Sequence, residues 1–108
     1  TSQARVIQLS SGVASIAQSD KFAQAPLDAY AMSKAALNMF TRRFALQCQT
    51  SKQIVCALSP GWVQTDMGGQ DATSTVQDAS RKIVTLIERL TIADTGHFFD
   101  ENGAQLPW

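Results

Sequence analysis

The 108-residue sequence has no excess of charge of either sign and no long apolar run. Nine Lys and Arg residues balance nine Asp and Glu residues, so no long-range field attracts nucleic acid or an anionic membrane. No apolar stretch approaches the roughly 18 residues that a membrane helix needs, and the first residues resemble neither a signal nor a transit peptide. We therefore expect no nucleic-acid or membrane partner and a cytoplasmic location.

Cysteine and histidine are also scarce. Cys48 and Cys56 are too few for a disulfide framework, and each lies in an apolar pattern typical of a reduced core thiol. The single histidine, His97, has no second metal-type ligand at a useful spacing. The sequence therefore predicts no metal site and a structural or surface role for His97.

Apolar spacing alternates between the period of a strand and that of a helix. The patterns predict, in chain order, a strand at 5–9, an irregular connection at 12–28, a helix at 29–50 with Asp28 as its N-cap, a buried strand at 54–58, a loop at 62–74, a helix at 75–90, a short strand at 96–99, and a turn followed by a tail at 100–108. This order is typical of one small α/β domain with parallel strands and helices on the sheet faces.

Two short polar segments follow predicted strands. They are Ser10-Ser11-Gly12 and Pro60-Gly61. The carboxyl ends of parallel strands meet at one edge of a sheet, and ligands bind there. We expect both segments at that edge.

Tyr30 and Lys34 are four residues apart in the first predicted helix, so they share one face. An ammonium near a phenol favours the phenolate, and such a phenol can give a proton to a developing alkoxide or take one from an alcohol. The same spacing often arises by chance. The pair alone is therefore a weak indication of catalysis.

Three segments together resemble the motifs of the short-chain dehydrogenase/reductase family. They are Leu9-Ser10-Ser11-Gly12, Tyr30-Ala31-Met32-Ser33-Lys34 and Pro60-Gly61-Trp62-Val63-Gln64-Thr65. Residues 60–69 and 96–108 are most similar to the branch of sniffer-type carbonyl reductases and C-factor-like proteins. The resemblance implies the C-terminal half of a Rossmann-type doubly wound parallel sheet, with the order strand-helix-strand-helix-strand.

The resemblance also implies a catalytic set. Tyr30 would be the general acid in carbonyl reduction and the base in alcohol oxidation. Lys34 would favour the Tyr30 phenolate and hydrogen-bond the nicotinamide ribose. Ser11 would orient the substrate carbonyl, with Ser10 as the alternative.

A cofactor loop and a substrate loop are implied as well. Pro60 and Gly61 would shape the nicotinamide end of the site, the Val63 backbone would meet the carboxamide, and the Thr65 hydroxyl would support it. The loop from Asp66 to Ser74 would cover the substrate. Trp62 and Met67 would form its apolar wall, although local packing is an equally good interpretation of Trp62.

Several features of the family have no counterpart in this sequence. It contains no Gly-rich turn between a strand and a helix, no Asn-Ala-Gly segment, no residue that selects between NAD and NADP, and no match for the family's catalytic Asn. We expect residues 1–108 to form a single partial domain, the catalytic half of the fold without its nucleotide-binding half. NADP is favoured over NAD, but the segment that would decide between them is absent from this sequence.

Three functions remain open at this point. The first is an NAD(P)-dependent oxidoreductase acting on a small carbonyl or alcohol substrate. The second is a non-catalytic C-factor-like signalling or interaction protein, and the third is an inactive truncated product. Because the strand at 5–9 would have an unpaired edge, we expect low stability for the chain by itself. A homo-oligomer or the missing N-terminal half would cover that edge.

Overall fold

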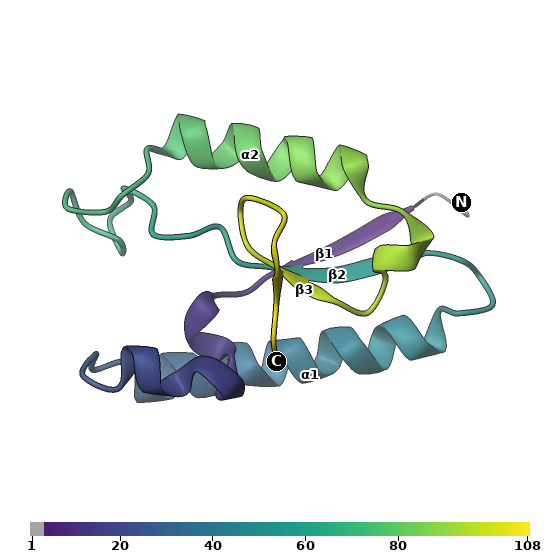
Figure 1. Cartoon of the computed structure of the whole chain (residues 1–108), viewed down its shortest axis with the longest axis horizontal. Helices are drawn as coiled ribbons and strands as arrows, with labels where there is room; N and C mark the ends of the chain where they lie inside the picture. Colours follow the sequence, from purple (N-terminus) through teal and green to yellow (C-terminus); the bar gives the residue numbers. More distant parts are fainter. Residues whose placement is uncertain (1–3) are drawn as a thin grey trace.

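The chain folds into a four-stranded sheet between two helices. The computed structural model describes residues 4–108. The strands are β1 (Arg5–Leu9), β2 (Ile54–Leu58), β3 (Phe98–Phe99) and β4 (Gln105–Leu106), and they lie in the order β1-β2-β3-β4. Helix α1 (Asp28–Gln47) covers one face and α2 (Val76–Arg89) covers the other (Figure 1). The predicted α/β class and the strand–helix alternation are confirmed.

Strand β2 forms the centre of the core. All five of its residues are buried, and it pairs in parallel with β1 on one side and with β3 on the other. Because successive side chains point to opposite faces, its residues divide between two apolar clusters. One cluster lies against α2 and contains Ile54, Cys56, Leu58, Leu86, Leu90 and Phe99; the other lies against α1 and contains Ala45, Cys48 and Val55.

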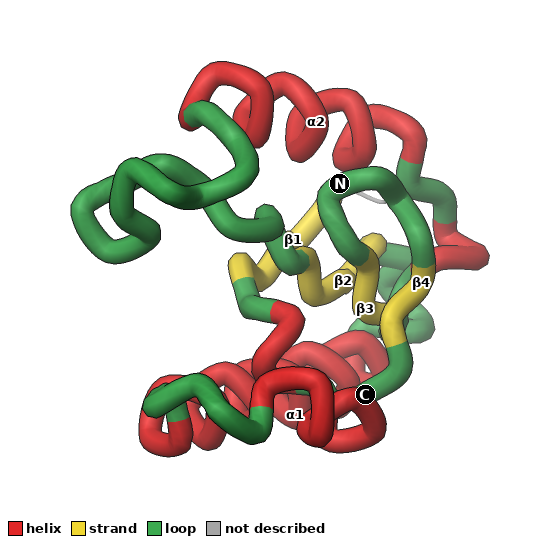
Figure 2. Tube along the Cα trace, turned by 60° about the vertical axis from the view of Figure 1, so that its left-hand side comes forward, coloured by secondary structure: helices red, strands yellow, loops and turns green. Residues whose placement is uncertain are grey.

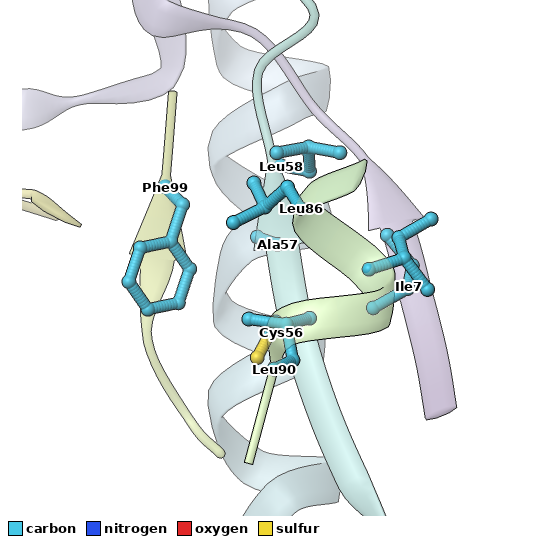
Figure 3. Close-up of a pocket in the computed structure, with 8 residues that line it drawn as sticks. Ile7, Cys56, Ala57, Leu58, Leu86, Leu90 and Phe99 are labelled. Carbon is cyan, nitrogen blue, oxygen red and sulfur yellow. The ribbon is translucent and has the colours of Figure 1, made fainter. Parts of the chain in front are cut away.

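The two helices are built differently. Helix α2 turns an aliphatic face to the sheet. Leu86 on the helix and Leu90 at its C-cap gather with Ile7 and Cys56 (Figure 3) around a space too small for a water molecule. The inner face of α1 is instead small and polar, with Asn38, Thr41 and Ala45 buried. Four of its large apolar side chains are exposed, namely Met32, Met39, Phe40 and Leu46, whereas Phe44 is partly buried against the core.

One expected helix cap is wrong. Leu27 occupies the N-cap position of α1 without a side-chain cap, and Asp28 is the first helical residue. A carboxylate in the first turn still interacts favourably with the helix dipole, so Asp28 acts there by charge. The helix also ends at Gln47, three residues before the predicted boundary at Thr50.

The C-terminal segment is more than a tail. It forms β4, which pairs antiparallel with β3, so the sheet is mixed at this edge (Figure 2). The reversal is held by Asp100, whose Oδ1 accepts hydrogen bonds from the backbone N–H groups of Asn102 and Ala104, both at 2.9 Å. Trp108 then stacks on Phe98 with ring centroids 5.5 Å apart. A two-residue strand is too short to produce a periodic pattern in sequence.

The connection between β1 and α1 contains two 3-10 helices, at Gly12–Ala14 and Ile16–Phe22. The C-terminal segment ties this connection down, because Ser15 Oγ donates a hydrogen bond to the Pro107 carbonyl at 2.7 Å. Within residues 4–108, β1 has a strand partner on one side only. No helix in this part of the chain combines the length and apolar character that crossing a bilayer requires.

Candidate active site

The carboxyl ends of β1, β2 and β3 form one rim. Leu9 pairs with Leu58 in the parallel register, so Ser10 and Ser59 leave their strands at the same level. The Ser10 N–H donates to the Leu58 carbonyl at 2.8 Å, and the Ser59 N–H donates to the Phe99 carbonyl at 2.8 Å. The Ser10-Ser11 and Pro60-Gly61 segments therefore begin side by side at this edge, as the order of strands predicted.

Lys34 connects helix α1 to this rim. Its Nζ donates a hydrogen bond to the Leu9 carbonyl at 3.0 Å and lies 5.7 Å from the centroid of the Tyr30 ring. Helical spacing places both residues on the face that meets the end of β1. The Tyr30 hydroxyl has no hydrogen-bond partner within residues 4–108, so it is available to a ligand.

The two serines at the end of β1 have different surroundings. Ser11 caps the first 3-10 helix, where its Oγ accepts a long hydrogen bond of 3.4 Å from the Val13 N–H. Its own hydroxyl hydrogen is thereby left to donate. Ser10 is buried and its Oγ donates to Asn38 Oδ1 at 2.6 Å. Of the two, Ser11 is the one whose donor remains free for a carbonyl oxygen.

Asn38 was missed by the sequence interpretation. It lies one helical turn beyond Lys34 on the same face of α1 and is only 4% exposed. Its Nδ2 is buried and has no partner in the part of the chain that the structure describes. The sequence signal was available, because residues 30, 34 and 38 continue one four-residue spacing, but a polar residue in a helix is more often exposed.

The loop after β2 presents backbone groups to the rim. Gly61 has φ of +80°, a conformation that glycine adopts at little cost. Val63 forms a bridge with Ser74, and its carbonyl accepts from the Thr65 N–H at 2.8 Å. The Val63 N–H has no partner within residues 4–108. Thr65 Oγ1 accepts from the Gly68 N–H at 3.1 Å and keeps its own hydrogen.

Trp62 and Met67 lie on the outside of the same loop. Trp62 is 51% exposed, and its Nε1 donates to the Gly68 carbonyl at 2.7 Å. This contact agrees with local packing, the alternative interpretation of Trp62. Met67 is 81% exposed.

A second residue missed from sequence is Glu101. It follows β3, the third strand that ends at this rim, and it is partly buried. A Cβ placed on Gly61 would lie 2.9 Å from both Cδ and Oε1 of Glu101, so this carboxylate packs directly against the Pro60–Thr65 loop. The sequence interpretation missed Glu101 because the adjacent Asn102-Gly103 pair indicated only a turn.

Other reactive groups lie away from the rim. Burial raises the pKa of the Cys56 thiol from 9.0 to about 11, and the nearby Asp94 carboxylate adds to the effect. His97 contacts the Asp94 carbonyl through Nδ1 at 3.1 Å. A hollow of about 600 Å³ lies at the opposite, amino ends of the strands, beside Arg5 and Lys52. Within residues 4–108, no three His, Cys, Asp or Glu side chains are grouped to hold a metal ion.

The chain is similar in sequence to known proteins. The family model described as enoyl-(acyl carrier protein) reductase matches residues 1–99. The C-signal of Myxococcus xanthus is 45% identical over 80 residues, which are 74% of this chain and 48% of that protein.

The fold is also similar to that of solved carbonyl reductases. The carbonyl reductase Sniffer of D. melanogaster is 33% identical with a TM-score of 0.84, covering 96% of this chain and 41% of its own. The NADPH-bound carbonyl reductase from chicken fatty liver is 30% identical with a TM-score of 0.89, covering 99% of this chain and 45% of its own. The chain spans less than half the length of each of these relatives.

Proposed function

Because the chain belongs to the short-chain dehydrogenase/reductase family, we propose that it is the catalytic portion of an NAD(P)-dependent oxidoreductase that reduces carbonyl compounds or oxidises alcohols. One observation carries this proposal. Lys34 lies beside the Tyr30 ring and donates to the Leu9 carbonyl, which brings a proton-donating phenol to the strand end that bears Ser11. A proton donor and a carbonyl-orienting hydroxyl are the two groups that such a reaction requires of the protein.

Each catalytic residue has a defined task in this proposal. The free hydrogen of Ser11 Oγ donates to the substrate carbonyl oxygen and orients it. The Tyr30 hydroxyl gives its proton to that oxygen as negative charge develops there, and takes a proton in the reverse direction. The Lys34 ammonium stabilises the phenolate that remains.

The residues present also fit the nicotinamide end of a cofactor. NAD(P) supplies or accepts the hydride, and NADP is favoured because NADPH and NADP occur in the solved carbonyl reductases. The Val63 N–H, which has no partner within residues 4–108, suits the carboxamide oxygen. The Thr65 hydroxyl would support it, and Pro60 and Gly61 would shape this end of the site. The Lys34 ammonium would donate a hydrogen bond to a ribose hydroxyl.

The partial coverage of the relatives defines the rest of the proposal. The chain covers 41% of the Sniffer structure and 45% of the chicken enzyme. We propose that residues 1–108 are one partial domain and that a separate segment, the N-terminal half in the family, binds the adenosine end and pairs with β1. The substrate of the complete protein would be a small carbonyl or alcohol, and its location would be cytoplasmic. Association of two copies into a homo-oligomer is the alternative way to cover β1.

The proposal is tested by supplying the remainder of the fold. The chain is assayed alone and fused behind the part of the chicken carbonyl reductase that it does not match. Binding of NADPH and NADH is followed by tryptophan fluorescence, since Trp62 adjoins the expected nicotinamide site. Turnover is followed by loss of cofactor absorbance with a panel of aldehydes and ketones. Absence of both signals in the fusion would refute an oxidoreductase function.

Substitutions then separate chemistry from binding. In the active fusion, Tyr30→Phe should lower turnover by about 10²–10⁴-fold and leave cofactor affinity nearly unchanged. Lys34→Ala should weaken both, because its ammonium serves phenol, ribose and the Leu9 carbonyl. The matched control is Lys82→Ala, at an exposed position of α2. Full turnover in Tyr30→Phe would show that the proton donor is misassigned.

A second function is a signalling or interaction protein without catalysis. The observation in its favour is the 45% identity to the C-signal of Myxococcus xanthus, the highest identity among the three relatives described above. The same variants decide between the two functions. A biological effect that survives Tyr30→Phe, in a protein that binds no cofactor, would favour signalling over turnover.

A further inference from the structure

Glu101 occupies a chemically informative place at the rim. Three strands end there, and the first two bear predicted site residues, Ser11 after β1 and Gly61 after β2. The third, β3, is followed by Asp100 and Glu101. Asp100 is used by the turn, since its Oδ1 accepts two backbone N–H groups, whereas Glu101 has no such structural task.

The Glu101 carboxylate is held without a counter-charge. It packs against the Cα of Gly61, where any larger residue would meet its Cδ and Oε1 at 2.9 Å. No hydrogen bond or ion pair reaches it from the described residues 4–108. A partly buried carboxylate with no partner keeps much of its field, because solvent screens it less than a surface charge. That field acts at the loop proposed to hold the nicotinamide ring.

We propose that Glu101 is a specificity-determining residue that makes the site select carbonyl substrates without an anionic group near the reacting carbonyl. A carboxylate on the substrate would face a like charge, which raises the free energy of its binding. A neutral substrate, or one with a hydroxyl or ammonium donor, meets an acceptor in the same place. The inference rests on the proposed oxidoreductase function and names the substrate class of that site.

The test reaction is the reduction of an aldehyde to an alcohol by NADPH. An aldehyde accepts hydride at its carbonyl carbon from NADPH and a proton at its oxygen from Tyr30, which gives the primary alcohol and NADP⁺; Tyr30 regains its proton from solvent. The aldehyde is reduced and the cofactor is oxidised. Glu101 takes no part in these bond changes, so its effect should appear in KM and leave kcat nearly constant.

A matched pair of probes isolates the charge. 4-Carboxybenzaldehyde and methyl 4-formylbenzoate have the same ring and aldehyde and differ by one negative charge. In the active fusion we expect kcat/KM for the ester to exceed that for the acid by about tenfold or more, the scale of one close charge pair in partly screened surroundings. Glu101→Gln, which keeps shape and removes charge, should reduce this ratio several-fold by lowering KM for the acid.

The control is Glu88→Gln, an exposed residue near the end of α2 that lines the hollow at the opposite end of the sheet. It removes the same charge from the protein and should leave the ratio unchanged. An unaltered ratio in Glu101→Gln, or equal changes in both variants, would overturn the inference while the oxidoreductase function stands. Lack of turnover on either probe and on the wider aldehyde and ketone panel would overturn both together.

Discussion

The buried hydrogen bond between Ser10 and Asn38 allows a sharp prediction about stability. Ser10 Oγ donates to Asn38 Oδ1 at 2.6 Å, both residues are 4% exposed, and Asn38 Nδ2 has no partner in the described residues. The native protein therefore already carries one unsatisfied buried group at this contact. Such a group costs about 1–3 kcal/mol, and leaving a partner unpaired after a substitution costs a similar amount.

These magnitudes set an order among three variants. Ser10→Ala removes the one partner that the Asn38 side-chain amide has within residues 4–108, and it should lower the free energy of unfolding by about 1–3 kcal/mol. Asn38→Leu leaves the Ser10 hydroxyl unpaired but removes the orphaned amide, so its net effect should be small. The double variant removes these unpaired groups, and Leu keeps the branched shape of Asn with a larger volume. It should match or exceed the native stability, by up to about 2 kcal/mol.

The assay is urea unfolding followed by tryptophan fluorescence, because Trp108 stacks on Phe98 in the core and reports loss of packing. Gln47→Leu, at an exposed position of the same helix, is the control and should change stability by no more than about 0.5 kcal/mol. A coupling energy near zero in the double-mutant cycle would refute the reasoning. If the double variant is stable yet less active in the fusion, the pair is retained to position Ser11.

Two further predictions concern single positions. Gly61→Ala should cost about 1–2 kcal/mol of stability, because φ is +80° and a Cβ would meet Glu101; thermal unfolding measures this, and an unchanged Tm would contradict it. Burial raises the pKa of the Cys56 thiol in the folded protein from 9.0 to about 11. The contribution of the neutral thiol to the free energy of unfolding is therefore present in full below pH 9 and is lost as pH rises through about 11. Compared with Cys56→Ala, the native chain should therefore lose about 2–3 kcal/mol more stability between these pH values, and parallel pH profiles for the two proteins would argue against this.

The spacing of apolar residues was sufficient to predict an element that is buried on one face or completely. The continuous apolar run at 54–58 predicted a fully buried central strand, and β2 has those bounds. The aliphatic spacing from 75 to 90 predicted α2, which begins after the Thr75 cap. The spacing also located helix α1, but Met32, Met39 and Phe40 of that pattern are exposed, and two polar residues, Asn38 and Thr41, are buried instead. Hydrophobic spacing alone therefore located the helix but not its buried side.

The failures have a common cause in long-range contacts. Strand β4 exists because the Asp100 turn folds residues 105–106 back onto β3, and two residues carry no period of their own. Glu101 became a candidate only when the third strand end was seen beside Gly61.

By itself, the sequence determined which groups could carry the proposed chemistry: the Tyr30–Lys34 spacing, the serine after one strand and the Pro-Gly turn after another, in the order that marks the family. Only the tertiary structure decided how these groups are used. In the tertiary structure Ser10 donates to Asn38, Ser11 keeps its hydroxyl hydrogen for another acceptor, and Lys34 donates to the Leu9 carbonyl. The physical reason is that side-chain hydrogen bonds between residues 25 or more positions apart depend on how α1 packs on the sheet, which no local pattern encodes.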